Sequence, residues 1–329
     1  MNQYLKNMSA TQQVGAMFLI VFGCLALAGI VVFLLSTREY PEGPAGDAKR
    51  QLLARADGVL RSSWVMVIVF WIGWLSGDTV ATVLFGLVSF FALREFLTLS
   101  PTRRSDHRSL VLAFFVILPL QYLLVGTEHF DLFTVFIPVY VFLAIPVVSA
   151  LANDPQRFLE RNAKLQWGIM VCIYGMSHVP ALLLLDFPKY HNKNAFLVIF
   201  LVLVVQVCMV VQFFAARWLQ RAPAAPAISS SFNWPSWWIG VAAGSLLGAL
   251  LAGVTPFSPA QAFAMAGVAC VAGSLGHLVM KAIKRDRGIP IWGADGSGVT
   301  GTGGLMDRVD ALCFAAPVFF HSVRWYFQL

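Results

Sequence analysis

Long apolar runs recur along the whole chain and constrain its fold more than any other feature. There are ten of them, at residues 14–35, 64–76, 79–93, 110–125, 132–151, 167–187, 195–214, 237–254, 260–280 and 311–327. An α-helix needs roughly 20 apolar residues to cross about 30 Å of hydrocarbon. Hydrophobic residues make up 58% of the chain and charged residues only 12%, which is too little charge to cover a water-soluble surface. The sequence therefore predicts an all-α, polytopic integral membrane protein with about ten transmembrane helices.

Lysine and arginine are distributed unevenly between the loops of this ten-helix arrangement. Of the 23 in the chain, 19 lie in the first, third, fifth, seventh and ninth loops. Because positively charged loops stay on the cytoplasmic side, we expect both termini on the opposite side and residues 281–310 in the cytoplasm. The net charge of +7 is spread over loops and is not clustered on one face. This distribution argues against a nucleic-acid partner.

The chain divides most naturally at residues 221–236, an irregular segment rich in proline and serine. We expect residues 1–220 to hold helices one to seven, and residues 237–329 to hold the C-terminal helices together with the polar segment 281–310. Another loop stretch, residues 47–61, places apolar side chains on one helical face and basic ones on the other. It is predicted to lie on the anionic cytoplasmic membrane surface, with a solvated connector as the alternative.

Few ionisable or amide side chains interrupt the apolar runs, and such residues are functional candidates by default. His178 either lines a cavity or is hydrogen-bonded to a neighbouring helix. Gln206 and Gln212 lie six residues apart, about 240° around a helix, so they need not face one groove. Arg94 and Glu95 end the third run, where we expect a structural ion pair or side chains that snorkel to the membrane surface.

The polar segment 281–310 holds five basic residues, four aspartates and six glycines between positions 293 and 304, and His277 lies about one turn before it. Glycines let the backbone turn its amides toward a bound anion, and basic side chains balance phosphate charge. Asp307 and Asp310 are three residues apart, so on a helix they share a face, and their oxygens suit a hard divalent cation. The segment therefore predicts phosphoryl or nucleotidyl transfer. The alternative is a positively charged membrane anchor with a flexible loop.

The same segment resembles the signature of phosphatidate cytidylyltransferases, also called CDP-diacylglycerol synthases. That signature reads Ser-x-x-Lys-Arg-x-x-x-x-Lys-Asp, then a short stretch to His-Gly-Gly-x-x-Asp-Arg-x-Asp before the last span. The chain matches it at Lys284-Arg285, Gly303-Gly304 and Asp307-Arg308-Val309-Asp310, just before the run 311–327. Residues 89–96 (SFFALREF) also resemble a divergent bacterial branch of the family.

The resemblance implies transfer of CMP from CTP to phosphatidate or another lipid phosphate, giving CDP-diacylglycerol and pyrophosphate in phospholipid synthesis. It implies Mg²⁺ as cofactor, a bacterial inner membrane as location and a possible homodimer. Asp307 and Asp310 would be the catalytic, metal-binding residues. The residues that would bind substrate are Lys284, Arg285, Arg308, Thr302, Gly303 and Gly304.

The chain also departs from the family pattern. Lys281 replaces the signature serine, Pro290-Ile291 replaces Lys-Asp, and Thr302 replaces histidine. Two hypotheses follow. In one, the enzyme is intact and Asp295 or Asp286 supplies the missing metal carboxylate. In the other, the chain is a catalytically impaired homologue that binds lipid or a partner protein. A secondary transporter is a third and weaker alternative, because broken helices and buried charges are few.

Overall fold

The computed structural model describes residues 10–38, 40, 43–98, 103–187, 194–289, 292 and 304–328. Every regular element in this part of the chain is helical, as the sequence predicts. The α-helices are α2 (Ala10–Ser36), α3 (Pro44–Ser76), α4 (Asp78–Thr98), α5 (His107–Leu112), α6 (Leu118–Gly126), α7 (Phe130–Val135), α8 (Phe142–Ala150), α9 (Phe158–Gly168), α10 (Met176–Leu183), α11 (Ala195–Leu219), α12 (Trp234–Leu250), α13 (Pro259–Asp286) and α14 (Met306–Phe327). Between them lie the 3₁₀ turns η1 (Arg104–Asp106) and η5 (Leu251–Val254) and the π-helical segments η2 (Ala113–Ile117), η3 (Phe136–Val141) and η4 (Ile169–Gly175).

Within the described residues, seven helical stretches are long and apolar enough to cross a membrane. They are Gln12–Ser36, Asp78–Thr98, Arg104–Gly126, Phe130–Ala150, Ala195–Leu219, Trp234–Val254 and Pro259–Asp286. The chain is therefore a polytopic integral membrane protein, but the expected count of ten spans is wrong and about seven is correct. The orientation derived from ten crossings stays a prediction.

The three other apolar runs are parts of different elements. Residues 64–76 belong to α3, whose apolar part is the short stretch Met66–Ser76. Residues 167–187 are divided between α9, η4 and α10, and every residue of α10 is buried inside the protein. Residues 311–327 form most of α14, which opens with charged residues and is also largely buried. An apolar run signals burial, and burial against other helices requires the same residues as contact with lipid.

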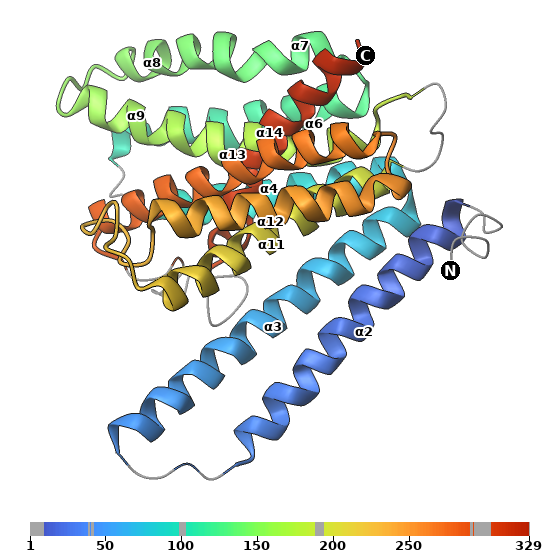
Figure 1. Cartoon of the computed structure of the whole chain (residues 1–329). Coiled ribbons are helices and arrows are strands. Elements are labelled where there is room, and N and C mark those ends of the chain that lie inside the picture. The colour runs from blue at the N-terminus through green and yellow to red at the C-terminus, as the bar shows by residue number, and fades with distance from the viewer. Residues whose placement is uncertain are drawn as a thin grey trace.

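The helix pair α2–α3 leans away from the rest of the molecule, whereas α14 lies inside it (Figure 1). Only 6% of the apolar window of α2 is buried, and α2 packs mainly on α3. α11, α12 and α13 pack side by side. α14 contacts α13, η4, α10 and α11. We call the helices from α4 to α14 the helical body. The charged first turn of α14 lies within it.

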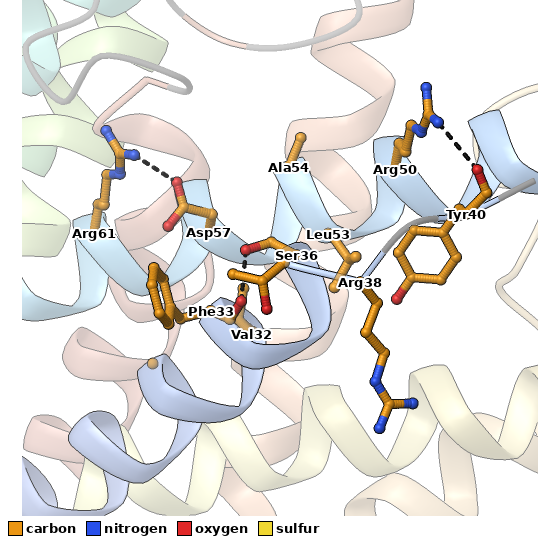
Figure 2. Close-up of a pocket in the computed structure, with 12 residues that line it drawn as sticks. Val32, Phe33, Ser36, Arg38, Tyr40, Arg50, Leu53, Ala54, Asp57 and Arg61 are labelled. Carbon is orange, nitrogen blue, oxygen red and sulfur yellow. Dashed lines mark hydrogen bonds and ion pairs between the residues drawn. The ribbon is translucent and has the colours of Figure 1, made fainter.

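The tip of the α2–α3 hairpin is polar (Figure 2). Residues 47–61 form the first part of α3, a helix of 33 residues. At 1.5 Å per residue such a helix is about 50 Å long, which exceeds about 30 Å of hydrocarbon. These residues and the end of α2 line a cavity of about 880 Å³, where Arg61 pairs with Asp57 at 2.8 Å and Arg50 donates to the Tyr40 carbonyl at 3.1 Å. Association of this tip with an anionic membrane surface stays a prediction.

Residues 220–233 connect α11 to α12 without a helix. They overlap residues 221–236, for which the sequence predicts irregular structure, but α12 already begins at Trp234. The segment ends at Asn233, whose side-chain oxygen accepts the backbone N–H of Ser236 at 3.0 Å and so caps α12. α11 and α12, on the two sides of this segment, pack extensively against one another. The division of the chain into two parts at this segment stays a prediction.

Two apolar clusters form the core. One packs α10, α11, α13 and α14 together, with Phe196, Phe200, Phe319 and Phe320 among its fully buried side chains. The other joins α4, η4 and the start of α14, and it includes the buried side chain of Trp292. The second cluster thus surrounds the start of α14, where the polar segment 281–310 becomes helical again.

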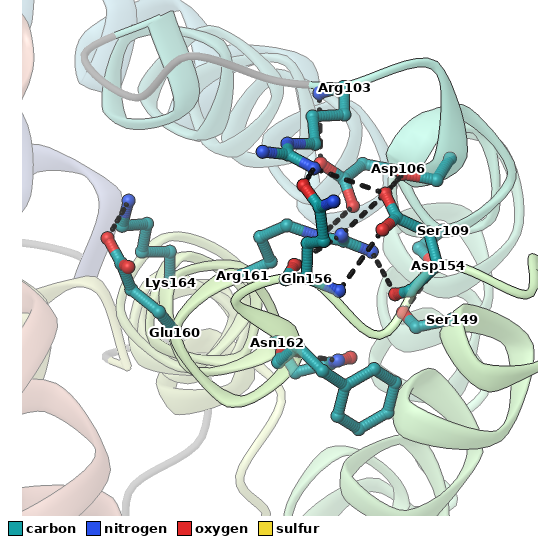
Figure 3. Close-up of polar contacts among 12 residues, drawn as sticks. Arg103, Asp106, Ser109, Ser149, Asp154, Gln156, Glu160, Arg161, Asn162 and Lys164 are labelled. Carbon is teal, nitrogen blue, oxygen red and sulfur yellow. Dashed lines mark hydrogen bonds and ion pairs between the residues drawn. The ribbon is translucent and has the colours of Figure 1, made fainter.

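Ion pairs tie the loop that contains η1 to the loop that precedes α9 (Figure 3). Arg161 on α9 lies 2.8 Å from both Asp106 and Asp154. The hydroxyl of Ser105 donates to Asp154 at 2.8 Å, and Arg103 lies 3.6 Å from the same carboxylate. These contacts hold the two loops together at one end of the helical body.

The hydrogen bond from the Ser105 hydroxyl, with a second from the Gln156 amide and the charges of Arg161 and Arg103, holds the pKa of Asp154 below its ordinary value. A carboxyl whose pKa is lowered in the folded state stabilises that state above its unfolded pKa of about 3.9 and loses the effect as pH falls further.

We therefore expect wild type to have a higher Tm than Asp154→Asn above about pH 5. The difference should shrink toward zero as pH falls through and below about 4, because the carboxylate becomes protonated. Thermal unfolding in detergent across this pH range measures it. A Tm difference that stays constant down to strongly acidic pH would contradict the expectation.

Candidate functional site

The candidate site lies where the end of α13 packs antiparallel to the start of α14. His277, Lys281 and Lys284 are spaced by four and three residues on α13, so they share one helical face. That face meets Asp307 and Asp310, which share a face of α14. Two helices therefore present matching rows of basic and acidic side chains.

Asp307 is fully engaged by protein donors. The Lys284 ammonium donates to its Oδ1 at 2.6 Å, and the backbone N–H of Trp292 donates to its Oδ2 at 3.0 Å. The side chains of Lys284 and Asp307 are 14% and 18% exposed, so this ion pair is partly buried. Coulombic attraction is stronger in such a site than at the surface.

Asp310 is buried more deeply and is held by His277. Its Oδ2 lies 2.6 Å from His277 Nδ1, and its Oδ1 accepts the backbone N–H of Ala311. The Asp310 side chain is only 4% exposed, and that of His277 is 22% exposed. Lys281 is close enough to interact electrostatically with Asp310 and Lys284.

A glycine permits this close contact. Gly276 precedes His277, and a Cβ added at Gly276 would collide with the ring of Phe314 on α14. Small residues at helix interfaces allow backbones to approach, which brings the polar side chains beside them into hydrogen-bonding range.

The remaining site residues predicted from the sequence are not gathered in one place. Arg308 points to a different side of α14 and lines an apolar groove, and its Nε is buried with no hydrogen-bond partner among the described residues. Arg285 is exposed. Asp286 pairs with Arg287 at 2.8 Å, and its side chain is 66% exposed. Asp295, Thr302 and Gly303 lie outside the described residues.

The described residues do not offer a ready site for Mg²⁺. Both oxygens of Asp307 and both oxygens of Asp310 already accept hydrogen bonds from the protein. No group of three or more His, Cys, Asp or Glu side chains gathers in the described part of the chain. Lys284 and His277 engage oxygens through which the two carboxylates would hold a metal ion.

The apolar groove lies between the α2–α3 hairpin and the helical body and has a volume of about 340 Å³. Its walls include Phe18 and Val21 of α2, Phe70 of α3 and Val202 of α11. Asp307 and Arg308 also line it. The groove therefore joins an apolar space to the charged first turn of α14.

Glu95 contacts the site in a way that the sequence did not predict. The end of α4 was expected to place it in an ion pair or at the membrane surface, but its side chain is buried at 1% exposure. Its Oε2 accepts the backbone N–H of Leu305 at 2.7 Å, directly before α14. The contact joins residues 210 positions apart in the sequence, and no local pattern signals it.

The intramembrane polar residues have separate surroundings. His178 is fully buried, its Nδ1 donates to the Tyr174 carbonyl of its own helix at 2.7 Å, and its ring packs on Phe133. Gln206 lines the apolar groove, whereas Gln212 packs near Gly240 of α12. The two glutamines thus face different neighbours, which their spacing allows.

Comparison with known proteins connects this geometry to a family. A profile of the cytidylyltransferase family matches residues 59–326, which include α4, α13 and α14. The uncharacterized protein YnbB of Escherichia coli (strain K12) is 32% identical over 310 residues, covering 93% of this chain and 96% of that protein.

We expect Lys284 and Asp307 to be energetically coupled. Lys284→Met should lower Tm because it leaves a partly buried carboxylate unpaired, and adding Asp307→Asn should restore part of the loss, with a coupling of about 0.5–3 kcal/mol. Thermal unfolding of the double-mutant cycle measures it.

The surface pair Lys164 and Glu160, 2.7 Å apart, is the matched control, with an expected coupling of about 0.3–0.5 kcal/mol. Equal coupling energies in the two cycles would show that the Lys284–Asp307 pair contributes no more to stability than the surface pair.

Proposed function

Because the chain belongs to the cytidylyltransferase family, we propose that it transfers a cytidylyl group from CTP to a lipid phosphate. Phosphatidate is the proposed acceptor, and CDP-diacylglycerol and pyrophosphate are the proposed products. The proposal includes a bacterial inner membrane, cytoplasmic placement of residues 281–310, and a possible homodimer.

The observation that carries this proposal is the apolar groove that ends at a charged helix turn. A lipid phosphate has an apolar body and an anionic head, and both need matching surroundings at once. Apolar side chains of α2, α3 and α11 supply one environment, and Arg308 supplies the other. The Nε of Arg308, which has no hydrogen-bond partner within the described part of the chain, is a donor suited to a phosphate oxygen.

The triphosphate of CTP is proposed to lie on the basic face of α13. Lys281, Lys284 and Arg285 lie within its last turns, and Lys281 and Lys284 face the acidic turn of α14. Cations held in a partly buried site stabilise charge that develops on phosphate oxygens during transfer. Asp307 and Asp310 keep two of the basic side chains of this face, Lys284 and His277, in fixed positions.

The proposed reaction is one displacement at phosphorus. An oxygen of the lipid phosphate forms a bond to the α-phosphorus of CTP. The bond from that phosphorus to the oxygen that bridges to the β-phosphorus breaks, and the electron pair leaves with pyrophosphate. Lys284, Arg285 and Arg308 balance the charge of the phosphates before and after this step.

Mg²⁺ is proposed as a cofactor on the family resemblance alone. When bound, it would balance phosphate charge as a Lewis acid. Its binding to Asp307 and Asp310 would require these carboxylates to release Lys284 and His277. No step above is assigned to the ion.

A second candidate function has its own support. The engagement of Asp307 and Asp310 by Lys284 and His277 favours a family member that has lost transfer and binds lipid or a partner protein. The groove serves this function equally well, so the two proposals differ in chemistry and not in lipid binding.

We expect purified protein with CTP, Mg²⁺ and phosphatidate to release pyrophosphate, and Asp307→Asn to abolish the release. Omitting Mg²⁺ and adding a chelator in the same assay tests the cofactor. Asp57→Asn at the exposed hairpin tip is the matched control and should retain full activity. No release and no CTP binding by the wild type would favour the impaired homologue.

Filling the groove should weaken lipid use selectively. Val202→Trp, on the groove wall of α11, should raise the KM for phosphatidate about tenfold and leave the KM for CTP unchanged, because apolar contact area for the acyl chain is lost. Val210→Trp on the same helix is the control, since Val210 is 50% exposed and does not line the groove. Steady-state kinetics in lipid–detergent micelles compares them, and equal effects of the two substitutions would count against the groove as lipid site.

A further inference from the structure

Glu95 of α4 caps the helix that carries the proposed catalytic residues. Its Oε2 accepts the N–H of Leu305, and the backbone amide of Met306 also interacts with this carboxylate. Leu305 is the N-cap residue of α14 and provides no side-chain cap of its own. The first amides of a helix need acceptors, and a carboxylate there also interacts favourably with the helix dipole. A distant helix thus supplies the missing cap.

The same end of α4 contacts both chain segments that border Asp307. A Cβ at Gly304 would collide with Oε1 of Glu95, so only glycine leaves room for this carboxylate. The next residue, Phe96, stacks on Trp292 with ring centroids 5.7 Å apart and planes 21° apart. Trp292 in turn donates its backbone N–H to Asp307. Two consecutive residues of α4 therefore contact both segments next to Asp307.

The carboxyl group of Glu95 occupies the N-terminus of α14 and so limits where a substrate phosphate can bind. A helix N-terminus is a natural anion site, but at α14 a protein carboxylate already fills it. A phosphate at that point would meet the oxygens of a buried carboxyl group. The cations nearest to Asp307 and Asp310 are on α13, where Lys284 is paired with Asp307 and Lys281 interacts electrostatically with Asp310.

We propose that Glu95 is a positioning residue: by capping α14 it fixes the place of Asp307 and Arg308 relative to the cations of α13. Its kinetic consequence rests on the proposed cytidylyl transfer, whereas the cap itself does not. Oε1 has no hydrogen-bond partner among the described residues, so one carbonyl-type acceptor is sufficient. Glutamine should therefore replace Glu95, and alanine should not.

The kinetic test compares Glu95→Ala, Glu95→Gln and Glu160→Ala in the full chain in lipid nanodiscs. Glu95→Ala should lower kcat about 100-fold, since small displacements of catalytic groups have effects of this size. Its KM for CTP should stay within about threefold, because the substitution removes none of the basic side chains of α13. Glu95→Gln should stay within about fivefold of wild type in kcat. Glu160→Ala, which removes an acidic side chain from the surface of α9, should leave kcat unchanged.

Hydrogen–deuterium exchange tests the cap without any activity. Peptides that cover residues 304–310 should exchange faster in Glu95→Ala than in wild type, and Glu95→Gln should exchange like wild type. Gly304→Ala displaces the Glu95 carboxylate and should reproduce the faster exchange, which gives a second variant if Glu95→Ala does not fold.

Two results would overturn the proposal. One is unchanged exchange and unchanged kcat in Glu95→Ala. The other is a Glu95→Gln protein with wild-type exchange but the same loss of kcat as alanine, because the negative charge would then act in the chemistry itself. If wild type transfers no cytidylyl group, the proposed function fails, and the exchange comparison alone decides whether Glu95 caps α14.

Discussion

Contact between the carboxylates of α14 and the donor side chains of α13 is the interaction on which the rest of the site depends. An ionised carboxylate left alone inside an apolar body is costly by several kcal/mol, so Asp310, with a side chain 4% exposed, requires a close donor such as His277. Pairing at hydrogen-bond distance in turn requires the helices to approach closely, which Gly276 permits. α14 packs among α13, η4, α10 and α11. This central position allows its first turn to face several neighbouring elements.

The first turn of α14 therefore lies between an apolar environment and a charged one. On one side of α14, an apolar groove is open between the α2–α3 hairpin and the body; on the other, the basic face of α13 is held in place by carboxylates. A reaction between a lipid and a nucleotide needs such a boundary, because its two substrates prefer different solvents. Only 6% of the apolar window of α2 is buried inside the protein, so most of this wall of the groove is accessible from outside the protein.

Much of the fold could be predicted from the sequence, and the errors of that prediction have a physical cause. Apolar runs indicated helices correctly, but residues 167–187 and 311–327 are apolar because protein surrounds them, as η4, α10 and α14 show. The signature residues Lys284, Asp307 and Asp310 were found by motif, and their contact is a property of the fold. Spacing placed Asp307 and Asp310 on one face of a helix, yet no spacing rule indicates that Lys284 and His277 occupy their oxygens.

The sequence by itself determined the class of the protein: apolar composition requires a membrane, and the order of Lys-Arg, Gly-Gly and Asp-Arg-x-Asp indicates the family. Only the tertiary structure decided which charges meet. Helical periodicity describes neighbours within about one turn, whereas Glu95 and Leu305 come together because α4 and α14 pack in the same body. The sequence therefore predicted an ion pair or a membrane-surface position for Glu95, whereas in the fold Glu95 is a buried helix cap.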